Sequence, residues 1–160
     1  NTGGTNTTIL PKTYSNEVYS TEGTVLLSSP AGNETESSFE VLDGQNTKKI
    51  DFIKSQSKIL IGSGSIIIYY KDAPSSLIYG NKIIEIKHSI NDASCSNKMN
   101  IYSIKSDGNA HFLIKYDAES GDYSQDKLGY LPPAIQSIRC SPNNDSLLVS
   151  TNEGMYIVKL

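Results

Sequence analysis

Residues 134–160 read AIQSIRCSPNNDSLLVSTNEGMYIVKL, which is three short apolar runs separated by two polar turns. Pro142 fixes φ in the first turn, and the asparagine and aspartate side chains beside it can bond to their own backbone. Gly154 can supply the positive φ that a tight reversal needs in the second turn. The spacing predicts three antiparallel strands that follow one another directly along the chain.

This order of strands and turns resembles a blade of the WD-repeat family. SPNND (141–145) stands where that family commonly has an SPDG-like turn, and GMYIVKL (154–160) stands where it has a GxIxIW-like strand. The Trp-Asp pair that usually closes the third strand is replaced by Lys159-Leu160, and no Gly-His pair precedes the blade. The resemblance implies a β-propeller blade, and with it a role in protein binding.

The preceding chain repeats the same rhythm of strand, turn and strand, and we find no stretch with sustained helical spacing of apolar residues. We therefore expect an all-β fold that is part of a β-propeller, with about three and a half four-stranded antiparallel blades. A self-contained β-sandwich is the alternative. Ile50, Ile83 and Ile135 are taken as equivalent first-strand positions. The expected parts are a loose N-terminal arm at 1–15 and a partial propeller at 16–160, with blades near 16–43, 50–79, 83–117 and 134–160.

An incomplete ring has a physical consequence, because a propeller closes only when roughly four to eight blades hide each other's faces. The remaining blades must come from the same chain or from another one. Made alone, residues 1–160 are expected to self-associate rather than remain a stable monomer. We expect that the units present cannot cover all of the following apolar side chains: Ile66, Ile67, Ile68, Leu147, Leu148 and Val149.

Composition excludes several classes of function. The net charge is −3 and the lysines and arginines are scattered, so no basic patch for nucleic acid is expected. No apolar run approaches the ~20 residues of a membrane span. The two cysteines, Cys95 and Cys140, are far apart and only two histidines are present, so neither a zinc site nor a disulfide framework is predicted. We expect both cysteines to be buried small apolar groups.

Three other groups of residues could bind a ligand or take part in catalysis, but we favour a structural role for each. Gly62-Ser63-Gly64-Ser65 is followed by an apolar strand rather than a helix, so we expect a turn and not a phosphate loop. His88 and His111 have no cysteine or carboxylate cluster near them in the sequence at the spacing of metal ligands, so we do not expect either to bind a metal or act in catalysis. Asp117, Glu119 and Asp122 surround Gly121, but their spacing does not match an EF-hand loop. We predict no catalytic, cofactor-binding or metal-binding residue, no cofactor and no enzymatic activity.

Ten tyrosines without a tryptophan suggest hydroxyls on a rim that contacts proteins, with half-buried positions at strand edges as the alternative. The tyrosines considered are Tyr69, Tyr70, Tyr79, Tyr102 and Tyr130. Asn6, Asn33 and Asn144 begin N-glycosylation sequons. In a chain so rich in asparagine and serine we expect these matches to arise by chance, in an intracellular, cytoplasmic protein.

The expected function is that of a non-catalytic protein–protein interaction scaffold, a propeller segment within a subunit of a larger intracellular complex. Its partners would be other protein subunits, and membrane trafficking is one setting that this hypothesis allows. The alternative is a secreted or cell-surface glycosylated β domain that binds a receptor or a glycan. The chain begins with Asn1 rather than with methionine, so we expect it to be a fragment, a processed product or the ordered part of something larger. Ser29–Ser38 is predicted to be a surface loop that proteases cut early.

Overall fold

The computed structural model describes residues 17–30, 36–43, 46–54 and 57–160, and all regular structure in these ranges is β. The strands form three four-stranded sheets and one three-stranded sheet, each an antiparallel meander. The first sheet contains β1 (Glu17–Thr21), β2 (Thr24–Pro30), β3 (Glu36–Asp43) and β4 (Asn46–Lys54). The second contains β5 (Ser57–Ile61), β6 (Ser65–Tyr70), β7 (Ser75–Tyr79) and β8 (Lys82–Ile86). The third contains β9 (Cys95–Asn97), β10 (Asn100–Asp107), β11 (Ala110–Asp117) and β12 (Tyr123–Lys127), and the last contains β13 (Ile135–Cys140), β14 (Ser146–Thr151) and β15 (Met155–Lys159).

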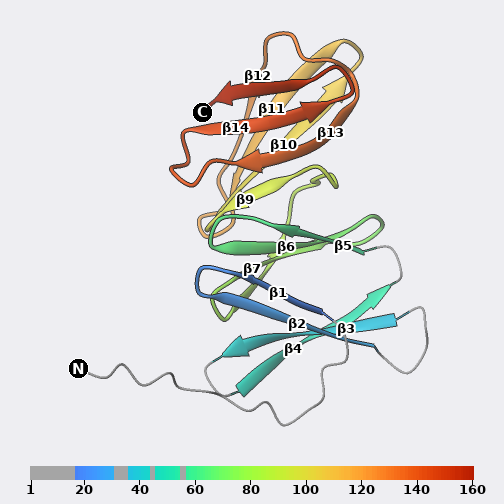
Figure 1. The fold of residues 1–160 in the computed structure, drawn as a ribbon, viewed down its shortest axis with the longest axis vertical. Coiled ribbons are helices and arrows are strands. Elements are labelled where there is room, and N and C mark those ends of the chain that lie inside the picture. The colour runs from blue at the N-terminus through green and yellow to red at the C-terminus, as the bar shows by residue number, and fades with distance from the viewer. Residues whose placement is uncertain (1–16, 31–35, 44–45, 55–56) are drawn as a thin grey trace.

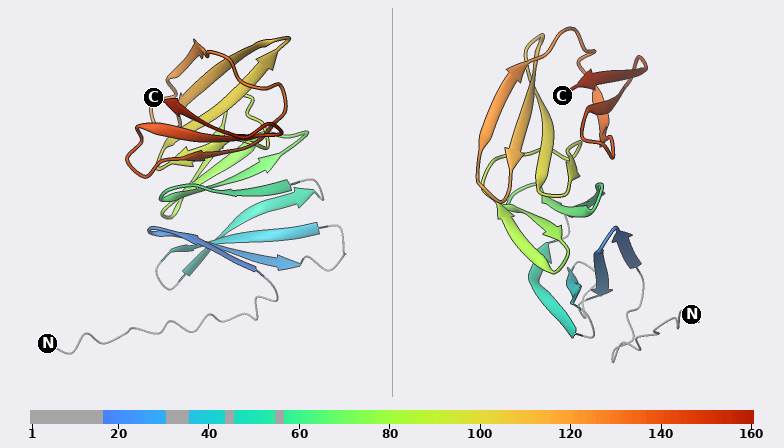
Figure 2. Two further views of the ribbon diagram at one scale, coloured as in Figure 1. Left: turned by 45° about the horizontal axis from the view of Figure 1, so that its top comes forward. Right: turned by 90° about the vertical axis from the view of Figure 1, so that its left-hand side faces the viewer.

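The four sheets follow one another in chain order. Figure 1 shows the first sheet at the bottom and the second above it, with the third and fourth overlapping at the top, and the right view of Figure 2 separates these last two. The first strands of successive sheets, β1, β5, β9 and β13, contact each other in that order. The side view in Figure 2 shows that the stack is curved into an open arc. These first strands begin at residues 17, 57, 95 and 135, which are steps of 40, 38 and 40 residues. Repeated four-stranded sheets that meet along their first strands form part of a β-propeller, as the sequence predicts.

The sheets stack because their strands are apolar on both faces. Successive side chains of a strand point to opposite faces, so Ile66 and Ile68 of β6 pack toward the first sheet while Ile67 packs toward the third. All three side chains are completely buried. A run that is apolar at every position is what a strand covered on both faces requires.

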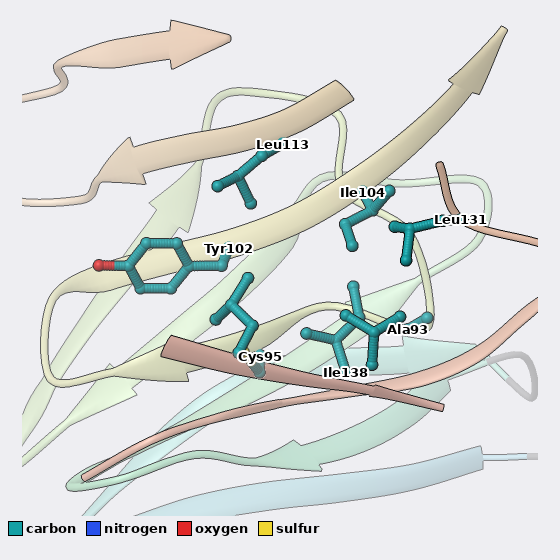
Figure 3. Packing of buried hydrophobic residues seen from close by; sticks show 9 residues of the cluster. Ala93, Cys95, Tyr102, Ile104, Leu113, Leu131 and Ile138 are labelled. Atoms are coloured by element: carbon teal, nitrogen blue, oxygen red, sulfur yellow. The ribbon is translucent and has the colours of Figure 1, made fainter. Parts of the chain in front are cut away.

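The third and fourth sheets enclose a further apolar cluster (Figure 3). Tyr102, Ile104 and Leu113 come from the third sheet, and Ile138 comes from β13. The ring of Tyr102 lies against the cluster while its hydroxyl points away from it, and this hydroxyl donates a hydrogen bond to Asn144 Oδ1 at 2.7 Å. Each sheet therefore forms a separate core with the next one.

Of the six apolar side chains that the units present were not expected to cover completely, one is exposed. Leu148 is 41% exposed. The other five, Ile66, Ile67, Ile68, Leu147 and Val149, are completely buried between the sheets present. The prediction that the sheets present cannot cover all six side chains therefore holds, through Leu148 alone. The other five are covered because adjacent sheets lie on both faces of β6 and on the inner face of β14.

The assignment of strands to sheets differs from the prediction at two positions. Ile50 lies in β4 and pairs with Phe39 of β3, and Ile83 lies in β8 and pairs with Ile78 of β7. Both residues thus belong to last strands rather than first strands. Outer strands were mistaken for inner ones because they too carry apolar side chains toward the neighbouring sheet, and because the real first strand β9 has only three residues. Between the predicted blades at 83–117 and 134–160, the structure has a further strand, β12 (Tyr123–Lys127).

Two expectations concern residues outside the described ranges. The N-terminal arm at 1–15 lies outside them altogether. The two ends of the predicted loop Ser29–Ser38 belong to strands, since β2 extends to Pro30 and β3 begins at Glu36, and residues 31–35 lie outside the described ranges.

The turns that follow the first strands are hydrogen-bonded from sheet to sheet. Gly62 and Gly64 in the turn after β5 make this possible, because a Cβ at Gly62 would overlap Ser96 of the third sheet and Gly64 has φ +74°. The predicted turn at Gly62–Ser65 is confirmed. The bonds join Thr21 Oγ1 to Gly62 O (3.0 Å), Ser63 N to Ser96 O (3.0 Å), and Asn97 Nδ2 to Ser141 O (2.9 Å).

Burial of Tyr70 should make the folded protein less stable at alkaline pH. It packs at the edge of the core between the first two sheets, and burial raises its pKa from 10.0 to about 12. As the pH rises, the unfolded chain therefore loses the phenol proton before the folded protein does. The contribution of protonated Tyr70 to the free energy of unfolding is complete below pH 10 and is lost as the pH rises toward about 12. Denaturant unfolding across this window should show a weaker loss of stability in Tyr70→Phe than in the parent. Tyr130→Phe, at a position 78% exposed, is the control and should keep the full pH dependence.

No helix among the described residues is long and apolar enough to cross a membrane.

Candidate functional site: an open sheet face and a hollow beside β10

The last sheet presents an apolar face to solvent. Leu147 and Val149 of β14 point into the core, so Leu148 between them points outward. Met155 and Ile157 of β15 are 74% and 69% exposed, and Leu148 pairs directly with Ile157 in the ladder. We call Leu148, Met155 and Ile157 the open face. It is the surface opposite the one that packs on the third sheet.

A hollow of about 600 Å³ lies beside β10 of the third sheet. One wall is the connector between β8 and β9, which contributes His88 through Ala93, and another contains Pro133 and Ile135. Its floor includes the consecutive residues 103–106 of β10. The lining is mixed, with hydroxyl, amide and imidazole groups among isoleucines, and its size is within the range of sites that bind small ligands or peptide segments.

The two histidines have structural surroundings. His88 stacks on Tyr123 with ring centroids 4.6 Å apart and meets the edge of Tyr116 at 4.9 Å. His111 is only 2% exposed, and its Nδ1 lies 2.9 Å from the hydroxyl oxygen of Ser106. Both rings are thus held by neighbours in or beside the third sheet, and of the two only His88 reaches the hollow.

The acidic residues after β11 form a turn. Asp117 Oδ1 accepts hydrogen bonds from the backbone N–H groups of Glu119 (2.8 Å) and Ser120 (3.0 Å). Glu119 forms an exposed ion pair with Lys82 at 3.7 Å. Within the described ranges, no three histidine, cysteine, aspartate or glutamate side chains are grouped as a metal ion would require.

Cys95 and Cys140 are joined by a disulfide bond, and the prediction of separate apolar thiols was wrong. Cys95 begins β9 and Cys140 ends β13, so the bond links the first strands of neighbouring sheets, with 5.8 Å between the Cα atoms. The 45-residue separation concealed this contact in the sequence. Because one sheet occupies about 40 residues, residues that far apart lie at similar positions in adjacent blades.

The five tyrosines considered differ too much in exposure to form a common rim. Tyr130 is 78% exposed, whereas Tyr102 is 5% exposed and bonded to Asn144. Tyr69, Tyr70 and Tyr79 are half-buried beside the apolar clusters. The alternative of half-buried strand positions describes these three tyrosines better than a binding rim does.

The turn at 141–145 is held by its own side chains. Ser141 Oγ donates to Asp145 Oδ1 at 2.8 Å, and Ser146 Oγ donates to the same oxygen at 2.7 Å. The hydrogen bonds from Ser146 and Ser141 lower the pKa of Asp145. Asn144 adopts φ +59°, which asparagine tolerates better than most residues. The polar residues that suggested a turn in the sequence therefore build it.

Comparisons with known proteins support the fold. No family model and no curated protein matches the chain. Among solved structures, it is similar to Hsv2 from Kluyveromyces lactis, with a TM-score of 0.56 and 12% identity over 89% of this chain and 47% of that one. It is also similar to Hsv2 from Kluyveromyces marxianus, with a TM-score of 0.57 and 13% identity over 90% of this chain and 46% of that one. Both are β-propellers, and this chain spans about half the length of each.

Proposed function

We propose that this chain is a non-catalytic protein-interaction scaffold, a propeller segment within a larger assembly. The open face carries the proposal, because three large apolar side chains on adjacent strands are exposed to solvent. Apolar side chains gathered on one face are typical of a surface that another protein element covers. A role as a subunit of an intracellular complex is the setting that we propose for it.

The occupant that we propose for the open face is a further propeller blade. Each of the three interfaces between the four sheets is formed by alternate apolar side chains of adjacent strands, and the open face has the same pattern. The similar propellers are about twice as long as this chain, which leaves room for further blades in a ring of that size. A blade from the same chain or from a partner subunit would pack here with the same alternation.

Self-association of residues 1–160 tests this proposal. Burying each open-face side chain fully is worth roughly 1.5 to 3 kcal/mol, so the isolated segment should associate in a concentration-dependent manner. The double variant Leu148→Thr/Ile157→Thr should weaken association by at least about tenfold in sedimentation velocity. Tyr130→Thr removes an exposed aromatic ring from a connector and is the matched control, with no change expected. A monomeric segment that melts cooperatively would contradict the proposal.

The disulfide favours a second candidate, the secreted or cell-surface domain. Disulfides persist in oxidising compartments and are rare in the cytosol, and Cys95–Cys140 is such a bond. Intact-mass measurement of the native protein separates the candidates. A glycan at Asn6, Asn33 or Asn144 would support the secreted domain, and two free thiols on an unmodified chain would support the intracellular subunit.

A further inference from the structure

The strand β10 has a neighbour along only part of its inner edge. It pairs with β11 over eight residues, from Asn100 to Asp107, but with β9 over only three, from Asn100 to Tyr102. In contrast, β5 and β6 pair over five residues, and β1 and β2 do the same. From Ser103 onward, the described part of the chain places no strand on the β9 side of β10.

Asn91 explains why β9 is so short. Its side-chain oxygen accepts a hydrogen bond from Ala93 N (3.0 Å), and its carbonyl accepts one from Ser94 N (3.2 Å), so residues 91–94 form a tight turn. The chain thus joins the sheet only at Cys95. The side-chain nitrogen of Asn91 reaches back and donates to Ile104 O at 2.8 Å.

The backbone groups at the vacant edge can be assigned from the ladder. Asp107 and Ala110 close a two-residue turn, and so do Asn97 and Asn100, which fixes the alternation of bonded pairs on both sides of β10. The odd-numbered residues of β10 bond to β11, and the even-numbered ones face the β9 side. Ile104 and Ser106 therefore direct their N–H and C=O groups to the vacant edge. Asn91 takes one of these four groups, the carbonyl of Ile104.

The hollow follows this edge. Residues 103–106 all line it, although Ser103 and Lys105 point to one face of the sheet and Ile104 and Ser106 to the other. Consecutive residues of one strand, whose side chains alternate between the two faces, line a single hollow when that hollow lies along the edge of the strand, where their backbone groups are. The hollow is the space that a longer β9 would fill.

The two sides of the hollow differ in polarity, one being apolar and the other charged. On the side toward the last sheet it is lined by Ile104 and Ile135. On the side toward the second sheet, Lys105 carries a charge, and the carboxylate in the lining, Asp92, is already paired with Lys58 at 3.3 Å. A strand lying here would direct alternate side chains to an apolar surface and to a cationic one.

We propose that the edge of β10 binds an extended peptide segment of a partner protein by strand addition. The segment's backbone pairs with the N–H of Ile104 and with the N–H and C=O of Ser106, the three groups that Asn91 does not take, as in other cases where a peptide adds a strand to a sheet. Its side chains alternate between an apolar residue facing Ile104 and Ile135 and an acidic residue facing Lys105. This site does not depend on which chain supplies the missing blades, because β10 lies within the sheets already present.

The test uses a phage-displayed library of random nine-residue peptides, panned on the native protein. Recovered peptides should alternate apolar and polar residues, with an acidic residue at a polar position. Hydrogen–deuterium exchange at the amides of Ile104 and Ser106 should slow roughly tenfold when such a peptide binds. The amides of Ser103 and Lys105 already bond to β11 and should not change. N-methylation of alternate peptide amides should abolish binding.

A proline variant tests the same edge from the protein side. Ser106→Pro removes a donor at the vacant edge without removing a backbone hydrogen bond to β11, so peptide affinity should fall about tenfold or more. It also removes the hydroxyl that lies 2.9 Å from His111 Nδ1, so Ser106→Ala, which removes only that hydroxyl, is a further control and should keep the peptide affinity. Gln125→Pro is the matched control, because its N–H points away from β11 at the outer edge of the same sheet. Three results would overturn the proposal: no peptide is recovered, the Ile104 and Ser106 amides are unaffected by bound peptide, or N-methylated peptides bind equally well. The peptide result decides the matter if Ser106→Pro fails to fold.

Discussion

Loss of the Cys95–Cys140 bond should lower the free energy of unfolding by about 4 kcal/mol, since the bond closes a loop of 45 residues in the unfolded chain. Without it, the unfolded chain gains conformational entropy while the folded sheets keep their other contacts. The double variant Cys95→Ser/Cys140→Ser, measured by denaturant titration in the native assembly, should show this loss.

Reductant provides the internal control. It should destabilise the parent protein by a similar amount and leave the double variant unaffected, because that variant has no bond to break. Equal stability of the parent with and without reductant, together with two titratable thiols in the native protein, would show that the two cysteines are not bonded.

Gly62→Ala should lower the free energy of unfolding by about 3 kcal/mol, more than any other single substitution in a turn. This value lies in the upper range for substitutions that overpack a site. A methyl group there would overlap the carbonyl oxygen and hydroxyl of Ser96 and lie 2.9 Å from its carbonyl carbon. Because one of the obstructing groups is backbone, β9 would have to move away from the second sheet. The hydrogen bonds of Ser63 with Ser96 and Lys98 would be lost with it.

Gly129→Ala is the matched substitution. A Cβ at Gly129 has no atom within 4 Å, so the change in unfolding free energy should stay within about 0.5 kcal/mol. If the two variants melt at the same temperature, the close approach of the second and third sheets at Gly62 is not required for stability.

The sequence was sufficient for the fold class because local signals are strong in each blade. The turn at 141–145 contains Pro142 and a hydrogen-bonding side chain at nearly every position, and the run from Ile66 to Ile68 is apolar on both faces. Such features depend only on neighbours along the chain. They therefore predicted strands, turns and an incomplete propeller, which the structure confirms.

The errors all concern contacts between blades or along strand edges. Whether Ile50 begins one sheet or ends another depends on which strand it pairs with, and its residue type does not reveal that. The bond between Cys95 and Cys140 depends on the alignment of two inner strands. The vacant edge of β10 depends on the side-chain bonds of Asn91, and the order of residue types along the chain carries no periodic signal for it.

The meander within each sheet also has a consequence for synthesis. In the described part of the chain, strands pair with their immediate neighbours in sequence, apart from one isolated bridge between Ser63 and Asn97, and each core joins one sheet to the next. The loops that must close at each step of folding are therefore short, and short loops favour rapid local folding. As the chain leaves the ribosome, each blade can form and then serve as the surface on which the following one condenses. Only the meeting of the first blade with the last in a complete ring would require contact between distant parts of the chain.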